Sequence, residues 1–444
     1  MYDVISAEER NIPAAGIFNE GFIEDARSAA SSRTMPAIRA VPSSIPCEAT
    51  DLADIDSGVQ AILDDVITAL TRSLSPEEKS PKSREPEKPT RFIFQGSLDE
   101  IQRFFYKRGW TDGLPVIPPT EDKVAEMLTG TDLPPDTLLG KLIPRQGKVT
   151  IEKIAVNAVM AGALPTYLPV IIAATRLLLD SESGFQGFCT FGVSTGSWSP
   201  LWIVNGPIRR DIQLNYSSGM MSPGNIANAA IGRTMGLIIK NLGGIRKGIE
   251  DMGVMGNPLK YTAVASENEE ESPWEPLHVE MGLDKSDSAV TIAFPQSYLQ
   301  HWPTSTDDEG ILRSVQDYLH GAFTHNIFFN PTHARILAKA GWTKQDIKDF
   351  LVEFGRTPAR RDPNSTAKLF KGRITPRPGE TIRIIRDPRV IRIVVAGGPG
   401  AFMAHAFGGG PTPGKNEIRK IELPRNWEKL VAKYKDMIPN HVRY

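Results

Sequence analysis

The sequence predicts an α/β protein with a small N-terminal parallel α/β unit and a larger mixed α/β body. Residues 1–71 alternate short apolar runs with helical patterns, and β-type runs recur between helical patterns over residues 92–444. Alternating strands and helices are typical of a sheet covered by helices. Between the two parts, residues 72–91 contain four prolines, many charges and one leucine. Such a composition cannot bury a core, so we expect a linker there.

The N-terminal unit is expected to start with a helical segment, which four further elements follow. A short apolar run over 12–18 predicts a buried strand, and a helix is expected over 22–32. A second strand is expected over 37–41, and apolar residues at helical spacing predict a helix over 54–70. The order strand, helix, strand, helix indicates that the two strands pair in parallel.

The body is expected to begin with a helix that ends at Arg108. Ser97 precedes this helix and its hydroxyl suits the N-cap, while Asp99 and Glu100 favour the positive end of the helix dipole. Further helices are expected over 121–129, 150–162, 166–180, 224–241, 309–322, 331–340 and 343–354, and strands over 201–204, 289–294 and 391–396.

Composition excludes several classes of function. The chain has 51 basic and 52 acidic residues, so it lacks the overall basic field of a nucleic-acid-binding protein. Its two cysteines, Cys47 and Cys189, cannot form a disulfide framework and are expected to be structural, which favours a reducing compartment. The polar start is unlike a signal peptide, and the longest apolar run, interrupted by Arg176, is too short to cross a bilayer. We therefore expect a cytoplasmic protein.

The segment 205–233 predicts a site for an anionic or polar ligand. Ser222 is expected to cap a helix that starts at Pro223, and a helix start offers free N–H groups to an anion. The polar side chains expected to bind the ligand are Asn205, Arg209, Arg210, Asn225, Asn228 and Arg233. The alternative interpretation is a closely packed helix with surface arginines beside it.

The acidic segment 267–280 contains candidate groups for proton transfer. His278 and Glu280 would face the same side of an extended strand, and Glu267 and Glu275 are further candidate bases. A metal site is one alternative, although His-x-Glu is a weak pattern, and a solvated acidic face is another.

Two glycine-rich segments complete the candidate site. A β-type run leads into Gly397 and Gly398, and ligands of open α/β sheets bind where strands end; His405 follows as a possible acid–base group. The alternative is a tight turn and a flexible loop. Trp110 and Asp112 lie on a proline-stiffened loop that could carry function or form a structural entry to the body.

Two sets of segments resemble known families. Residues 8–22, EERNIPAAGIFNEGF, with 35–39 and 75–79, resemble the later part of the UGSC-motif (seleno)protein family, which is distantly similar to component B of glycine and betaine reductases. Residues 109–119, GWTDGLPVIPP, with 205–209, 223–228 and 272–280, resemble a large uncharacterised bacterial domain sometimes found with UGSC-type units.

This resemblance implies a redox system or one that cleaves carbon–heteroatom bonds. The family's motif, a Cys or selenocysteine followed by Gly-Ser-Cys, would lie before Met1, and Cys47 stands alone in residues 1–71. We therefore expect residues 1–71 to be an incomplete redox unit, completed by upstream sequence or by a partner chain.

Together these observations predict an enzyme component that acts on an anionic or polar small molecule by lyase-like or reductive carbon–heteroatom cleavage. We expect the anionic group to be bound by Arg209, Arg210 and Arg233. The sequence does not identify a cofactor. The residues expected to transfer protons are Glu267, His278, Glu280 and His405. The alternatives are a non-catalytic subunit of a partner with the missing motif, and a metal-dependent hydrolase or lyase. A homo-oligomer or a complex with that partner is expected.

Overall fold

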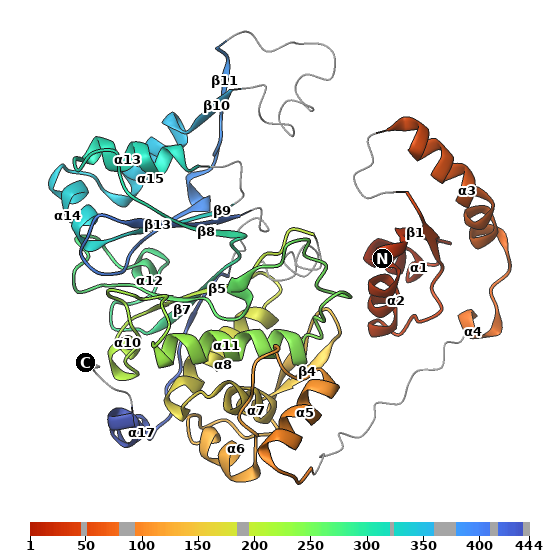
Figure 1. The fold of residues 1–444 in the computed structure, drawn as a ribbon, viewed down its shortest axis with the longest axis horizontal. Coiled ribbons are helices and arrows are strands. Elements are labelled where there is room, and N and C mark those ends of the chain that lie inside the picture. Colours follow the sequence, from red (N-terminus) through yellow and green to blue (C-terminus); the bar gives the residue numbers. More distant parts are fainter. Residues whose placement is uncertain are drawn as a thin grey trace.

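The computed structural model describes residues 1–45, 51–79, 94–183, 195–319, 324–358, 379–408 and 416–437. Within these ranges the protein has an α/β fold, with one small parallel sheet and two mixed four-stranded sheets that carry helices (Figure 1). A helix with the length and apolarity needed to cross a bilayer is not found among the described residues. Cys47 and Cys189 both lie outside them.

The N-terminal unit has the predicted order of strands and helices. Strands β1 (Gly16–Asn19) and β2 (Ala40–Ser43) pair in parallel, which confirms the predicted pairing. Helix α2 (Ile23–Ser32) connects them, and its buried residues are all alanines, so it lies close to the strands. Helix α1 (Tyr2–Glu8) precedes the strands and α3 (Leu52–Thr71) follows them.

Helix α3 buries only part of its apolar surface. Gly58 and Ile62 are buried on the side that faces β2. Other apolar side chains of the helix are exposed, namely Leu52, Val59, Leu63, Ile67 and Leu70. The helix also contains four aspartates and no lysine or arginine. It therefore presents an acidic, partly apolar face that no described part of the chain covers.

The predicted linker is described only as far as Lys79, and residues 80–91 lie outside the described ranges. Its first part forms the short helix α4 (Pro76–Lys79) and belongs to the N-terminal unit. Glu78 pairs with Arg72 at 2.6 Å and with Arg39 at 3.3 Å, and hydrogen bonds from Arg72 and Ser75 lower its pKa to about 2. The two shorter segments of the UGSC-like resemblance thus meet at the Arg39–Glu78 pair.

The N-terminal unit touches the body at Glu250. Ser28 on α2 donates a hydrogen bond to Glu250 Oε1 at 2.9 Å, and Arg145 and Arg246 hold the same carboxylate. Burial, with the neighbouring charge of Glu250, raises the pKa of Asp25 on α2 to about 6.

The first sheet of the body has the strand order β14–β7–β5–β6. Strand β5 (Leu201–Asn205) runs parallel to β6 (Val264–Ser266) and antiparallel to β7 (Ala289–Ala293). Strand β14 (Ile418–Lys420) pairs antiparallel with β7. All of β5 is buried, because alternate side chains face the helices on one side and the second sheet on the other.

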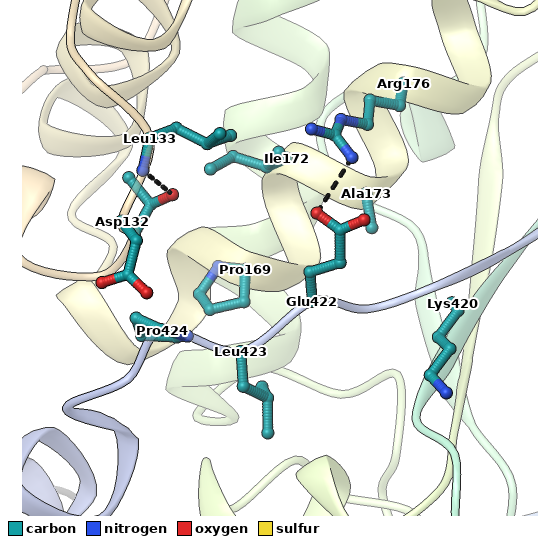
Figure 2. A pocket seen from close by; sticks show the side chains of 11 residues that line it. Asp132, Leu133, Pro169, Ile172, Ala173, Arg176, Lys420, Glu422, Leu423 and Pro424 are labelled. Atoms are coloured by element: carbon teal, nitrogen blue, oxygen red, sulfur yellow. Dashed lines mark hydrogen bonds and ion pairs between the residues drawn. The ribbon is translucent and has the colours of Figure 1, made fainter.

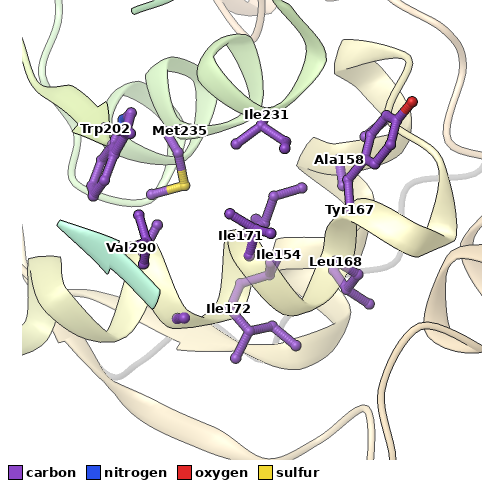
Figure 3. Close-up of a cluster of buried hydrophobic side chains, with 14 of the residues drawn as sticks. Ile154, Ala158, Tyr167, Leu168, Ile171, Ile172, Trp202, Ile231, Met235 and Val290 are labelled. Carbon is purple, nitrogen blue, oxygen red and sulfur yellow. The ribbon is translucent and has the colours of Figure 1, made fainter. Parts of the chain in front are cut away.

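Helices α8 (Leu168–Leu179) and α11 (Ile226–Asn241) cover the first sheet, and α7 (Ile151–Ala161) packs on both helices. Figure 3 shows side chains of these helices together with Trp202 and Val290 of the sheet in the main core. Burial of this apolar surface, at about 25 cal/mol per Å², is the main source of stability in this half.

The second sheet has the order β12–β9–β13–β8. Strand β12 (Ile391–Val395) is parallel to β9 (Thr324–Phe329), while β13 (Met403–Gly408) is antiparallel to both β9 and β8 (Ser297–His301). Helices α13 (Asp308–Asp317), α14 (Pro331–Lys339) and α15 (Lys344–Phe354) pack on one face around a separate core. The other face packs against the first sheet.

Smaller elements surround these sheets. They are α5 (Leu98–Arg108), α6 (Glu121–Leu128), α10 (Ile208–Asp211), α12 (Leu277–Glu280), α17 (Trp427–Tyr434), and the paired strands β3 (Leu138–Leu142) with β4 (Gly147–Thr150) and β10 (Arg356–Pro358) with β11 (Thr381–Arg383). Ser97 caps α5 as predicted, and Glu100 completes a capping box.

The prediction that Ser222 caps a helix starting at Pro223 is wrong. Helix α11 begins at Ile226, and Asn225 occupies the N-cap without a side-chain cap bond. The Asn225 amide instead donates to the carbonyls of Gly219, Met220 and Ser222. These bonds hold the preceding segment as a turn, so Ser222 and Pro223 cannot join the helix.

Candidate active site

Polar residues converge where three strands end. Asn205 is the last residue of β5, Glu267 follows β6, and Gly397 follows β12. Asn268 N–H donates to Val395 O at 2.7 Å, so the ends of β6 and β12 lie side by side. The carboxyl ends of parallel strands are where α/β sheets gather ligand-binding groups. We call the residues here the Glu267 cluster; it comprises Asn205, Arg209, Glu267, Glu269, Glu270, His278, Glu280, Lys344 and Lys348.

Glu267 lies at the centre of the cluster and is fully buried. Its Oε2 accepts hydrogen bonds from Asn205 Nδ2 at 2.6 Å and from Leu277 N at 2.8 Å. Burial raises the pKa of this carboxyl, and the Lys344 charge opposes the rise. Glu267 Oε1 accepts no hydrogen bond from any described residue and lies 3.9 Å from Lys344 Nζ.

Two lysines of α15 enter the cluster from the second half of the body. Lys344 Nζ lies 3.1 Å from Glu280 Oε2, and Lys348 Nζ donates to Glu280 Oε1. Burial disfavours the ionised form of Glu280, but the two lysine charges outweigh it and lower its pKa. Glu280 is therefore ionised and paired with the two lysines. Among the described residues, Lys344 is the one that lies near both Glu280 and Glu267.

His278 occupies a helix rather than the expected strand. In α12 each residue turns by roughly 100°, so His278 and Glu280 point about 200° apart and the expectation that they face one side is wrong. His278 is fully buried, and neither ring nitrogen has a hydrogen-bond partner among the described residues. Its Nδ1 lies 3.9 Å from Glu269 Oε1. Glu275, the other candidate base of this segment, is not part of the cluster.

Arg209 is committed to groups of its own chain. Its five N–H donors meet the carbonyls of Gly206 and Glu267 and the carboxylates of Glu269 and Glu270, and its guanidinium lies over the Tyr216 ring. No donor is left for a ligand. Arg209 thus organises the carboxylates of the cluster instead of presenting a positive charge to an anion.

Arg210 shares the Glu270 carboxylate with Arg209, whereas Arg233 pairs with a residue outside the cluster. Arg210 is exposed and 3.8 Å from Glu270. Arg233, on α11, forms a two-bond ion pair with Asp112 and donates to Pro115 O. The three arginines therefore do not form one anion site.

The loop that contains Trp110 and Asp112 is fastened to the same helix. Asn241 Nδ2 donates to Trp110 O at 3.0 Å, and the Trp110 ring packs edge-on against Phe104 and Phe105. These contacts fit the structural interpretation of this loop.

The remaining predicted residues mostly hold loops together. Asn228 exchanges hydrogen bonds with the backbone of Asn215, at 2.9 and 3.0 Å. Gly397 has φ of 81°, its N–H donates to Tyr216 O, and a Cβ at Gly398 would lie 1.7 Å from Ser218 Oγ. The glycines thus allow the end of β12 to approach the segment that follows α10.

His405 lies outside the Glu267 cluster. It is fully buried in β13 of the second sheet, and its Nε2 lies 3.0 Å from His325 Nδ1 on β9. His325 and His405 therefore form a separate buried pair.

Two cavities lie elsewhere in the body. One of about 610 Å³ borders the amino ends of β5 and β6, opposite the Glu267 cluster, and Asp112 is its only lining residue among those predicted for the site. A smaller one of about 130 Å³ lies between α8 and residues 420–424, where Arg176 pairs with Glu422 (Figure 2).

Sequence reasoning missed Lys344, Lys348, Glu269 and Glu270 as members of the cluster. The two lysines are four residues apart on a helix and so share a face, but this spacing is equally common on solvated helices. Within the described ranges, no group of three or more His, Cys, Asp or Glu side chains is arranged to hold a metal ion.

Comparisons with known proteins return no relative. No protein-family model matches the chain, and neither a curated protein nor a solved structure matches it significantly. The resemblance of the N-terminal unit to UGSC-type proteins stays a prediction.

Proposed function

We propose that this chain is an enzyme component that transfers protons on a small polar molecule at the Glu267 cluster. The observation that carries the proposal is the set of buried, unfilled polar atoms there. Glu267 Oε1, Asn205 Oδ1 and both His278 ring nitrogens lack hydrogen-bond partners among the described residues. Unfilled buried polar atoms cost free energy, and they are expected where a ligand supplies the missing bonds. Titratable groups with a shifted pKa are concentrated at such sites.

Burial favours a protonated Glu267, although the Lys344 charge favours the ionised form. The cluster has three cations, Arg209, Lys344 and Lys348, and four carboxyl groups. Burial has the larger effect and raises the pKa of Glu267. With Glu267 protonated, the cluster has equal numbers of positive and negative groups. A cluster with no excess positive charge suits a polar substrate better than a strongly anionic one.

This arrangement supports a lyase-like elimination. An unprotonated His278 nitrogen accepts a proton from a substrate carbon, and the electron pair of that C–H bond forms the new double bond as the carbon–heteroatom bond breaks. The Glu267 O–H then donates its proton to the leaving heteroatom. No oxidant or reductant is needed, so the reductive version of the predicted chemistry would depend on a partner.

The test is a search for turnover in a mixture of small polar metabolites, followed by mass spectrometry. An elimination conserves atoms, so the masses of two products should sum to the mass of the depleted compound, whereas hydrolysis would add one water. We expect Glu267→Gln to reduce turnover at least about 100-fold, the usual contribution of a general acid or base. Glu309→Gln, at an exposed ion pair on α13, is the matched control. No depletion by the wild-type protein, or equal depletion by E267Q, would oppose the proposal.

A second candidate role is that of a subunit, and the exposed apolar residues of α3 favour it. A single chain rarely leaves a continuous apolar stripe in water unless another surface covers it. Affinity purification of the tagged chain from its native host should recover one stoichiometric partner. The double variant Leu63→Gln/Ile67→Gln should lose that partner while keeping its unfolding midpoint, since both side chains are exposed.

A further inference from the structure

We infer that the cavity at the amino ends of β5 and β6 is a second ligand site, for a small molecule with an apolar body and one anionic group. The cavity measures about 610 Å³, within the range of sites that enclose a small organic ligand. It lies at the opposite end of the strands from the Glu267 cluster. The inference therefore does not depend on the proposed function.

The inner wall of the cavity is apolar. Trp202 contributes from β5, Ile239 from α11, and Leu259 and Ala263 from the segment before β6. Gly232 and Gly236 face this segment from α11, and a Cβ at Gly232 would lie 2.2 Å from Thr262 Oγ1. The two glycines let the segment lie directly on the helix, which fixes the shape of the wall.

The rim of the cavity is positively charged. Lys240, Lys247 and Lys260 line it with two aspartates, but both aspartates are already paired, Asp112 with Arg233 and Asp251 with Lys260 at 2.7 Å. Lys240 donates to the Gly109 carbonyl and its charge interacts with that of Asp112, whereas the exposed Lys247 forms no ion pair with a described residue. The ammonium group of Lys247 is therefore the one best placed to bind an anion.

The outer edge adds apolar surface next to these charges. Val254 and Met255 are 73% and 92% exposed at the mouth of the cavity, although they are large apolar side chains. Asn257 anchors their loop through hydrogen bonds to the carbonyls of Ser197 and Gln296. An apolar wall, an apolar mouth and the unpaired Lys247 together favour an aromatic or short-chain carboxylate, sulfonate or monophosphate.

The test uses 8-anilinonaphthalene-1-sulfonate as the anionic probe and N-phenyl-1-naphthylamine, which has the same rings without the sulfonate, as the neutral one. Titration of the full chain should give one saturable fluorescent site for the sulfonate, weakened by salt, and weaker binding of the neutral probe. Lys247→Glu should weaken sulfonate binding about tenfold, equivalent to about 1.4 kcal/mol. Lys429→Glu, at an exposed lysine of α17, is the matched control and should bind as the wild type does.

Three outcomes would overturn the inference. One is equal affinity of K247E and K429E for the sulfonate, and another is binding of the neutral probe as tight as that of the anion. The third is loss of the site in Leu63→Gln/Ile67→Gln, because the probe would then be reporting the exposed face of α3. Thermal unfolding of each variant by circular dichroism checks that the fold is intact.

Discussion

Asp112 and Arg233, each a candidate ligand-binding residue from the sequence, bind each other, with Arg233 Nε 2.8 Å from Asp112 Oδ2. Their side chains are 14% and 19% exposed, so the pair is mostly desolvated. It joins the loop after α5 to α11 across 121 residues of chain. Two separate sequence signals for binding thus correspond to one structural clamp.

Asp112→Asn should destabilise the protein by about 1–3 kcal/mol, because it leaves a largely buried guanidinium without its counter-charge. The measurement is the unfolding midpoint in urea. Glu309→Gln breaks an exposed pair on α13 and should cost about 0.5 kcal/mol or less. If D112N is as stable as E309Q, the pair is not a clamp and a binding role for both residues regains support.

Glu267→Gln should change how stability depends on pH. Burial raises the pKa of Glu267 in the folded protein above its ordinary value of 4.5, so the folded state holds this proton more tightly than the unfolded state. The free energy that this group contributes to folding is fully present below pH 4.5. It is lost as pH rises towards the folded pKa, by up to about 1.4 kcal/mol per pH unit.

Glutamine stays neutral, so the stability of E267Q relative to the wild type should increase as pH rises from 4.5. Urea unfolding at several pH values measures this difference. Glu309→Gln serves again as the control. Parallel pH profiles for E267Q and the wild type would show that Glu267 titrates normally.

Lys344→Met and Lys348→Met form a matched pair, because both lysines contact Glu280 but only Lys344 lies near Glu267. Removal of the Lys344 charge should raise the pKa of Glu267 further, since that charge now favours the ionised form. Infrared spectroscopy should therefore detect a protonated carboxyl to higher pH in K344M than in K348M, with E267Q assigning the band. The same titration in both variants would contradict the assignment of Lys344 as the counter-charge.

Asp25→Asn should strengthen the contact between the N-terminal unit and the body above pH 6. Burial and Glu250 raise the pKa of Asp25 from 3.8 to about 6, so ionisation in the folded state opposes the contact. The contribution of the protonated form is lost as pH rises from about 4 to 6, and it amounts to about 3 kcal/mol at most. The rate of limited proteolysis between the two parts, compared at pH 5 and pH 7, reports how firmly they are held together. Asp64→Asn, at an exposed residue of α3, is the control. Cleavage of D25N that accelerates with pH as in the wild type would rule out Asp25 as the titrating group.

Much of the fold follows from local patterns. The helices at 151–161 and 226–241 and the strands at 201–205 and 391–395 were predicted within a few residues, because their apolar spacing is continuous and each is buried against a sheet. The parallel pairing of β1 and β2 followed from the order of elements. Alternation misled at His278, because a His-Val-Glu sequence fits a strand, whereas Glu267 accepts the N–H of Leu277 at the start of a helix there.

The membership of the site was only partly predictable. Asn205, Arg209, Glu267, His278 and Glu280 do come together, because strand ends meet at one edge of the sheets. The roles differed where a side chain found its partner within the chain, as Arg209 did with Glu269 and Glu270. Lys344 lies 77 residues beyond Glu267 in the sequence, and nothing local marks it as a neighbour. Such a pairing depends on how the two sheets pack, which no short pattern encodes.

The hydrogen bond from Asn268 to Val395 has a consequence for the acidity of Glu267. It joins the segments at the ends of two strands of different sheets, so it ties the two halves of the body together beside the cluster. Glu267 belongs to the first half and Lys344 to the second, and Glu267 Oε1 lies 3.9 Å from Lys344 Nζ. Because a Coulomb interaction depends on separation, the proton affinity of Glu267 depends on how closely the two halves are held together at this point.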